Sequence, residues 1–375
     1  MKIPPYTTIF AYIPLSAEKE CVSIKRFDSI DILRTLAIIG MIQVHFTEIL
    51  SAYYDSSSLL FNISDLVGAF PAPLFTFLVG MSLFISVKRQ ENSGLQPGAI
   101  SDRNLRRGMA LFFLGLLFAT LIWTPAKVFG WDILTLIGAS LLIVFPLRKL
   151  NNGILTAVIL IIIAVSPLLR VWSDYPSYWN RWGDYVTSSD LKGVLLGLVA
   201  NGYFPLLPWL IFPLCGYLVG RACFKGELPR LPKSLLPLGA GLVLLSTGLL
   251  LVESAIVSKA SLVGVCITSF TFYPASTTFL AMALGIILIL FVLTFRFFDL
   301  QAERPLNSWF LTFSRRFSRY ALTAYVMHHA VMVWPILLAA NYTGRPDHWF
   351  YYGDVVPTAY ALALSLLFIV LFYGS

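Results

Sequence analysis

Apolar stretches of roughly 18 to 25 residues recur along the whole chain, and they constrain its fold more than any other feature. Each stretch is long enough to cross the ~30 Å hydrocarbon core of a bilayer as an α-helix. The composition agrees, because 58% of the 375 residues are hydrophobic and only 12% are charged, about half the charge of a soluble protein. The sequence therefore excludes a water-soluble globular protein and predicts an all-α, polytopic membrane bundle.

About ten membrane-spanning helices are predicted, separated by polar or Pro/Gly-containing breaks. The predicted spans are 30–51, 64–87, 105–123, 131–147, 153–171, 194–220, 234–253, 274–297, 320–340 and 356–374. The apolar segment 254–273 is short and contains Lys259, so it is an outer loop, a re-entrant piece or an eleventh crossing. Residues 1–24 are predicted to be a cytoplasmic lead-in without a signal-peptide cleavage pattern, and residues 25–375 a single transmembrane domain.

Positive charge is unevenly distributed between the two sides of these spans. With the N-terminus in the cytoplasm, 20 of the 27 Lys and Arg residues lie in inside segments and only six in outside segments. Because positive residues stay on the cytoplasmic side, both termini are predicted to be cytoplasmic and an eleventh crossing is disfavoured. This topology also accounts for the net charge of +8, so the lipid bilayer of the cell membrane, and no nucleic acid, is the predicted partner.

His45 and Arg34 lie within the first predicted span, where an ionisable side chain costs about 2.5 to 3.5 kcal/mol. Eleven residues separate them, which on a helix is three turns plus about 20°, so they project from one face ~16 Å apart. That face carries a cation near the cytoplasm and an imidazole near the outside. A purely structural alternative remains, in which Arg34 pairs with Asp31 and His45 hydrogen-bonds a neighbouring helix.

Asp65 begins the second predicted span at the same depth as His45. A carboxylate that holds the second nitrogen of a catalytic imidazole fixes its tautomer and stabilises the imidazolium. Asp65 is therefore a candidate to orient His45, and Glu48 competes for the same role. The structural alternative is that Asp65 belongs to the N-terminal cap of its helix.

His328 and His329 lie in the ninth predicted span, ~12 Å above its cytoplasmic boundary. Adjacent helical positions point about 100° apart, so at most one of the two is expected to face His45, and His328 is the candidate. No i, i+4 pair of His and Glu supports a metal site. The four cysteines are scattered, so neither a metal centre nor a disulfide framework is predicted.

The predicted cytoplasmic mouth of the bundle is basic. The segment 88–107 contains Lys88, Arg89, Arg103, Arg106 and Arg107. Positive-inside anchoring explains such a cluster. Arg103 and Arg106, at i, i+3 spacing where the third span begins, would also form a clamp for a phosphorylated ligand.

Proline interrupts two predicted spans. Pro71 and Pro73 must kink the second span or divide it into two pieces. Pro205, Pro208 and Pro213 imply a broken helix in the sixth span, and broken helices are tolerated in a membrane only where they are buried in protein or line a cavity. The sixth span is therefore predicted to be a cavity wall.

Several blocks of sequence resemble the transmembrane acyltransferase superfamily, most closely the catalytic region of the heparan-α-glucosaminide N-acetyltransferase family and its bacterial relatives. The blocks are RFDSIDILRTLAIIGMIQVHF (26–46), DLVGAFPAPLFTFLVGMSL (65–83), YFPLLPWLIFPLCGYLVGR (203–221), and FYPASTTFLAMALG (272–285) followed by SRYALTAYVMHHAV (318–331). The spacing of Arg34 and His45 is also similar to the arginine–histidine pattern of the acyltransferase-three family of O-acyltransferases.

This resemblance implies transfer of an acetyl group from cytoplasmic acetyl-CoA to a hydroxyl or amine, usually of a sugar, at the far side of the membrane. A histidine acts in these families as a base or transient acyl carrier. By the resemblance, His45 does the chemistry with help from Asp65 and His328. The residues that would bind the CoA phosphates are Arg34, Arg103, Arg106 and Arg107.

The chain departs from the heparan family at two places. The family histidine lies in the outer loop ahead of the aspartate that matches Asp65, and the corresponding residues 51–64 contain none. His45 would have to take that role, as in the acyltransferase-three pattern. Thr35 also stands where the family has glycine after its arginine.

Three functions are compatible with these features. The first is an acyl-CoA-dependent acetyltransferase that modifies an envelope sugar or glycolipid. The second is a multi-spanning transporter or flippase, in which the same polar residues line a substrate or proton path; the chain shows no internal repeat in support of it. The third is a family member without catalysis, acting as a partner or sensor. A homodimer is compatible with each of them.

Overall fold

The computed structural model of the chain describes residues 26–55, 57–123, 125–181, 183–226, 228–256, 264, 266–267, 269–300, 308–344 and 356–374. These residues form helices and the turns between them. The one β-type pairing among them is an isolated bridge between Trp179 and Tyr185. The predicted all-α fold is confirmed, whereas the lead-in 1–24 and part of the segment 254–273 lie outside the described residues.

The longer helices follow the predicted spans closely. They are α1 (Asp28–Asp55), α2 (Leu59–Gly68), α3 (Pro71–Asn92), α4 (Pro97–Phe118), α5 (Ile133–Leu147), α6 (Asn152–Trp172), α9 (Ile211–Phe224), α10 (Leu235–Ile256), α12 (Thr277–Phe298), α13 (Ser308–Arg319), α14 (Ala321–Thr343) and α16 (Thr358–Gly374). Shorter pieces are η1 (Ala119–Trp123), η2 (Pro125–Lys127), η3 (Tyr175–Tyr178), α7 (Leu191–Leu196), η4 (Gly197–Asn201) and α8 (Leu206–Trp209).

Seven helical segments among the described residues are long and apolar enough to cross a membrane. Three further helices are apolar but shorter, Ile133–Leu147, Leu235–Leu251 and Thr358–Gly374. The chain is therefore a helical membrane protein. The number of ten crossings and the cytoplasmic position of both termini stay predictions from the sequence.

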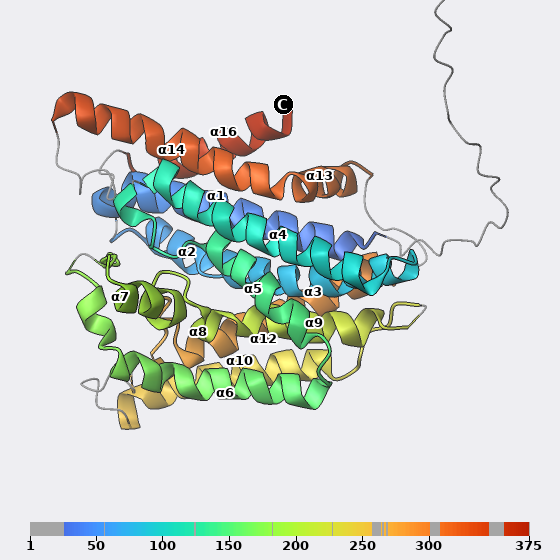
Figure 1. Ribbon diagram of the computed structural model, residues 1–375. Helices are drawn as coiled ribbons and strands as arrows, with labels where there is room; N and C mark the ends of the chain where they lie inside the picture. The colour runs from blue at the N-terminus through green and yellow to red at the C-terminus, as the bar shows by residue number, and fades with distance from the viewer. Residues whose placement is uncertain are drawn as a thin grey trace, which may run out of the picture.

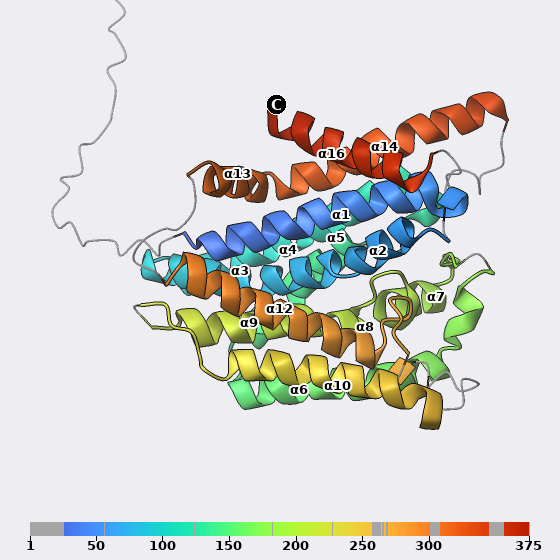
Figure 2. The same cartoon turned by 180° about the vertical axis from the view of Figure 1, so that it is seen from behind.

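Helix α1 is central to the bundle. It contacts α2, α3, α12, α13, α14 and α16, and the long helices run side by side in roughly one direction (Figure 1). Seen from either side, α13, α14 and α16 lie on one flank of α1 and α6 and α10 form the opposite flank of the molecule (Figures 1 and 2). A polar residue on α1 is thus placed between several neighbouring helices.

Helices α3 and α9 pack backbone to backbone through glycine. A Cβ atom added at Gly80 would lie 1.8 Å from the carbonyl oxygen of Pro213, and one at Gly216 would lie 1.9 Å from the carbonyl oxygen of Phe77. Small residues at helix contacts are typical of membrane bundles, where association depends on close packing. These two glycines therefore fix the separation of α3 and α9.

Both proline-containing spans are divided, as predicted. Pro71 begins α3 directly after α2 ends, and the N-terminus of α2 is capped by Ser58, whose hydroxyl accepts a hydrogen bond from the Phe61 N–H. The sixth span consists of α7, the π-helix η4, α8 and α9, with Pro205 preceding α8. The predicted broken helix is confirmed by these separate pieces. The helix breaks because proline lacks the N–H that an uninterrupted helix needs.

Candidate active site

The N-terminus of α1 is fixed by charged groups from two other helices. The Asp299 carboxylate, at the end of α12, accepts hydrogen bonds from the N–H groups of Asp28 (2.9 Å) and Ser29 (3.0 Å). Burial raises the pKa of the Asp299 carboxyl, and these hydrogen bonds oppose the rise. The Arg315 guanidinium of α13 donates to Asp28 at 2.8 and 3.0 Å. This end of α1 is thus held in register with α12 and α13.

Arg34 belongs to a polar network one turn further along α1. Its guanidinium donates to the hydroxyls of Ser318 (2.6 Å) and Ser82 (2.9 Å) and lies 3.7 Å from the Asp31 carboxylate. Asp31 also accepts from Arg26 and from the Ser318 hydroxyl. The predicted pairing of Arg34 with Asp31 is present as a weak contact, and the serines of α3 and α13 hold the guanidinium more closely.

The register of α13 against α1 corrects the predicted depth of His328. The sequence placed His328 ~12 Å above a boundary near residue 320. The helical structure begins at Ser308, and Arg315 pairs with Asp28 at the start of α1. α13 leads through a turn at Tyr320 into α14, and His328 there reaches His45, whose Nδ1 lies 3.0 Å from Nε2 of His328, so the two histidines lie at the same depth.

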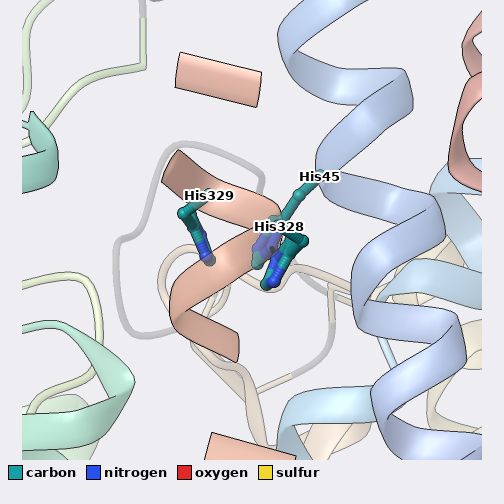
Figure 3. A group of neighbouring side chains, drawn as sticks. All are labelled: His45, His328 and His329. Atoms are coloured by element: carbon teal, nitrogen blue, oxygen red, sulfur yellow. Dashed lines mark hydrogen bonds between the residues drawn. The ribbon is translucent and has the colours of Figure 1, made fainter. Parts of the chain in front are cut away.

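His45, His328 and His329 form a cluster between α1 and α14 (Figure 3). Nδ1 of His45 lies 3.0 Å from Nε2 of His328, and their rings are stacked with centroids 5.3 Å apart. The His329 ring centroid lies 4.6 Å from that of His45. The prediction that at most one of the α14 histidines faces His45 was wrong, since the rings lean together across the angle between adjacent positions.

Backbone carbonyls determine the tautomers of the two α14 imidazoles. Nδ1 of His328 lies 2.8 Å from the carbonyl oxygen of Ala324, and Nδ1 of His329 lies 2.9 Å from that of Tyr325. A carbonyl oxygen only accepts, so each Nδ1 carries a proton, and in the neutral ring each Nε2 is bare. Nε2 of His328 must then accept from Nδ1–H of His45, which leaves Nε2 of His45 with its lone pair.

Burial distinguishes the three rings. His328 and His329 are 0% and 1% exposed, whereas His45 is partly accessible. One bare nitrogen, Nε2 of His45, therefore belongs to the ring that a reactant can reach. The three side chains also each offer one nitrogen, all within 4.8 Å of one another, as a group that could hold a metal ion.

Asp132 and Tyr325 support the cluster from behind. The Asp132 carboxylate caps α5 by accepting from the Leu134 N–H at 2.9 Å, and the Tyr325 hydroxyl lies 2.7 and 2.8 Å from its two oxygens. The Tyr325 ring packs against His329 with centroids 4.8 Å apart, and its carbonyl accepts from the same histidine. Asp132 is not among the site residues predicted from the sequence, although a carboxylate at the start of the predicted span 131–147 is a usable signal.

Aromatic side chains from the end of α4 complete the enclosure. Phe118 and Trp123 contact His329 edge to face, with centroids 5.1 and 5.6 Å apart. Trp123 lies on η1, a π-helical turn, and such turns are frequent at functional sites. The rings shield the buried side of the cluster from water.

Asp65 occupies a different place from the one predicted for it. The Nδ1 position of His45, where a carboxylate was expected, is taken by His328. Asp65 is exposed on α2 and interacts electrostatically with Glu48. It is the seventh residue of its helix, so the helix-cap alternative was wrong. Neither Asp65 nor Glu48 contacts His45 in the hydrogen bonds of the described residues.

A wall of aromatic residues lies beyond Glu48, on the turn after η3, the broken sixth span and the segment before α12. The Tyr273 hydroxyl interacts electrostatically with the Glu48 carboxyl, and Tyr273 is 41% exposed. Its ring packs against Trp179 and Tyr203, with centroids 5.3 and 5.6 Å apart. Flat rings with a few polar groups are typical of sites for small organic ligands.

The basic side chains of α4 divide into two sets. Arg106 pairs with Asp102 at 3.5 Å, and both side chains are more than 70% exposed, at 82% and 71%. Arg107 lies close enough to Arg34 for their charges to interact. Arg103 is one helical turn before Arg107 and shares its face. Arg107 is thus placed toward Arg34 and Arg106 toward solvent, and the Arg103–Arg106 clamp stays a prediction.

The sequence is similar to one family of known proteins. A family model described as heparan-alpha-glucosaminide N-acetyltransferase, catalytic, matches residues 26–252, which is more than half of the chain. No curated protein matches the sequence. The matched region contains His45, Arg34 and Asp132 and ends before the two histidines of α14.

Proposed function

Because the chain belongs to the heparan-α-glucosaminide N-acetyltransferase catalytic family, we propose that it transfers an acetyl group from cytoplasmic acetyl-CoA to a hydroxyl or amine of an envelope sugar or glycolipid. His45 is the general base. The observation that carries the proposal is the 3.0 Å contact between Nδ1 of His45 and Nε2 of His328, because it leaves the accessible imidazole with a bare Nε2.

The proposed chemical step is a direct acyl transfer. The acceptor oxygen or nitrogen attacks the thioester carbonyl as Nε2 of His45 removes its proton. The carbon–sulfur bond then breaks, and the CoA thiolate leaves with the bonding electron pair. The thiolate takes up the proton that Nε2 of His45 removed from the acceptor, so the histidine returns to its neutral form. The alternative, in which Nε2 of His45 itself attacks the thioester and carries the acetyl group, uses the same bare nitrogen.

His328 is a positioning residue and proton partner in this scheme. When Nε2 of His45 gains a proton, Nδ1–H of His45 is already hydrogen-bonded to Nε2 of His328. The positive charge can be shared by moving that proton to His328, whose Nδ1–H remains bonded to the Ala324 carbonyl. A hydrogen bond to a charged group is worth about 1.5 to 3 kcal/mol.

The donor is proposed to bind at the end of the bundle that holds Arg34 and Arg107. Two guanidinium groups close together fit the phosphates of CoA, because their planar donors match phosphate oxygens. The ~16 Å between Arg34 and His45 is comparable to the length of a pantetheine arm. Arg103 supplies additional charge on the same face of α4, whereas Arg106 faces solvent with Asp102.

The acceptor is proposed to bind at the opposite end, between His45 and the aromatic wall. Tyr273, Tyr203 and Trp179 offer apolar ring faces, and Glu48 and Asp65 offer carboxyl groups nearby. Such a surface fits a sugar, which has apolar C–H faces and many hydroxyls. Asp65 would then act on the acceptor rather than on His45.

The sequence topology gives the scheme its direction. We place the chain in the cell membrane with both termini in the cytoplasm, because positive residues concentrate on that side. The arginine end of α1 then faces cytoplasmic acetyl-CoA, and the histidine cluster lies toward the outside. Acetyl groups would cross most of the bilayer within the bundle.

The test measures CoA release from acetyl-CoA by the purified protein in detergent, with and without a panel of amino sugars and glycolipids. His45→Asn keeps an N–H donor near the Nδ1 position and removes Nε2. We expect it to lower kcat by about 100- to 10,000-fold while acetyl-CoA binding is retained. Arg34→Gln is expected to weaken acetyl-CoA binding about 10- to 150-fold, from the loss of charge-assisted hydrogen bonds.

Arg106→Gln is the matched control, because it removes an arginine of α4 that is exposed and paired with Asp102. Its KM for acetyl-CoA should equal that of the wild type. Failure of the wild-type protein to bind acetyl-CoA would refute the enzyme and favour the transporter or flippase. Full activity of His45→Asn would refute the role of the base.

A further inference from the structure

The hydrogen bond between His45 and His328 involves two imidazoles, yet nitrogen atoms of three imidazoles lie close together in the histidine cluster. One ligand atom from each of His45, His328 and His329 lies within 4.8 Å of the others. We propose that these three imidazoles form a site for a late first-row divalent ion, Zn²⁺ above all, and that its occupancy suppresses acetyl transfer.

The hydrogen bonds to the backbone select the ligand atoms. Nδ1 of His328 and of His329 donates to the carbonyls of Ala324 and Tyr325. Metal-binding histidines almost always donate their second N–H to a carbonyl or carboxylate, which fixes the ring and the tautomer. Nε2 of both rings is thereby presented, in the neutral form that a metal requires.

The spacing is close to that of a tetrahedral centre. With zinc–nitrogen bonds of about 2.0 to 2.1 Å, two ligand nitrogens in a tetrahedron lie about 3.3 Å apart. Nδ1 of His45 and Nε2 of His328 are already 3.0 Å apart, and the widest separation within the group is at most 4.8 Å. Side-chain movements of about 1 Å to 1.5 Å close the site, without a change in the helices.

Ligand type and number point to the class of ion. Imidazole nitrogen suits Zn²⁺, Cu²⁺ and Ni²⁺, whereas Mg²⁺ and Ca²⁺ prefer oxygen. Three histidines are also the protein ligand set of some open zinc sites. The Asp132 carboxylate lies behind Tyr325 and would offset part of the double charge.

Suppression follows from the proton on His45. The atom of His45 that faces the cluster is Nδ1. When a metal ion displaces the proton from Nδ1 and binds that nitrogen, the neutral ring carries its proton on Nε2. The nitrogen that would remove the acceptor proton is then no longer bare. This second half of the proposal rests on the proposed function of His45, whereas the metal site rests on the three imidazoles alone.

The experiment uses the full chain in detergent, stripped with a chelator and titrated with Co²⁺ and then with Zn²⁺. Tetrahedral Co²⁺ gives intense visible absorption bands, which Zn²⁺ should displace. His329→Asn and His328→Asn keep an N–H donor for the backbone carbonyl and lack Nε2. His348→Asn, at the fourth histidine of the sequence, is the comparison variant.

We expect a single Co²⁺ ion per chain with tetrahedral bands in the wild type and in His348→Asn. Each cluster variant should bind more than about 100-fold more weakly, since loss of a ligand exceeds the 10- to 100-fold effect of a second-shell change. Absence of these bands in the wild type, or equal binding by His329→Asn, would overturn the site. The wild-type titration decides this even where a variant does not fold.

Activity is compared as the ratio of zinc-loaded to chelated rates of CoA release within each protein. In the wild type and in His348→Asn, the zinc-loaded rate should be at most about a tenth of the chelated rate. In His329→Asn the two rates should be nearly equal. Equal rates with and without bound zinc would overturn the suppression. Zinc binding by a protein that never binds acetyl-CoA would refute the proposed function and leave the metal site standing.

Discussion

Replacing His328 by asparagine tests whether a hydrogen bond between two imidazoles serves catalysis. Asparagine keeps an N–H donor near the position of Nδ1, which bonds the Ala324 carbonyl at 2.8 Å. It lacks an acceptor at the position of Nε2, which receives Nδ1–H of His45 at 3.0 Å. The substitution therefore removes one defined interaction from the proposed base and leaves Nε2 of His45 in place.

The size of the effect follows from the charge that His45 gains when it removes a proton. A hydrogen bond to a charged group is worth about 1.5 to 3 kcal/mol, and each 1.36 kcal/mol changes a rate tenfold. His328→Asn should thus lower kcat about 10- to 150-fold. This loss is smaller than the loss expected for His45→Asn, and the KM for acetyl-CoA should not change.

His328→Gln is the conservative variant that separates catalysis from packing. The longer side chain can place its amide oxygen near the position of Nε2 and accept from His45, so kcat should return to within a few-fold of the wild type. The assay is steady-state CoA release with both substrates varied. The reasoning fails if His328→Asn has wild-type kcat, or if His328→Gln and His328→Asn are equally slow.

Three further predictions concern stability, measured as the free energy of unfolding of the purified protein in mixed micelles. Asp299→Ala should cost about 1 to 2 kcal/mol, because the first N–H groups of α1 lose their acceptor, whereas Asp299→Asn, which keeps an oxygen, should cost less than half of that. Tyr325→Phe should cost about 1.5 to 3 kcal/mol by leaving the Asp132 carboxylate without its hydroxyl donor; the same change in an Asp132→Asn background should cost clearly less. Gly80→Ala should cost about 1 to 3 kcal/mol, because its Cβ would lie 1.8 Å from a carbonyl oxygen of α9, and the control Gly241→Ala, with nothing within 4 Å, should be neutral or stabilising. Equal effects of the two glycine substitutions, of the two Asp299 variants, or of Tyr325→Phe in both backgrounds would contradict the respective arguments.

The helical part of the fold was predictable because a bilayer admits few structures. An apolar run of about 20 residues must satisfy its own backbone hydrogen bonds, so it becomes a helix. Proline then marks where such a helix must break, as it does at Pro71 and Pro205. These signals are local in sequence, and each of the ten predicted segments is helical in the structure.

The histidine cluster was predictable only in part. The depth of His328 depends on where the helical structure before it begins. That structure includes Ser308–Arg319, which is too polar to be predicted as part of an apolar span. The pairing of Arg315 with Asp28, which sets the register, joins residues 287 positions apart. No local pattern contains that information. Asp132 was accessible to the same reasoning that selected His45, since both are ionisable residues in a predicted span.

A neutral pair of imidazoles is well suited to hold a base inside a membrane protein. An ionised carboxylate beside His45 would place a charge within a span in the resting protein, which costs about 2.5 to 3.5 kcal/mol. Nδ1–H of His45 donating to Nε2 of His328 carries no net charge until the acceptor gives up its proton. Charge then develops only in the transition state, where its stabilisation accelerates the reaction. A dication would be effective against this site because it displaces the proton between Nδ1 of His45 and Nε2 of His328 and binds both nitrogens.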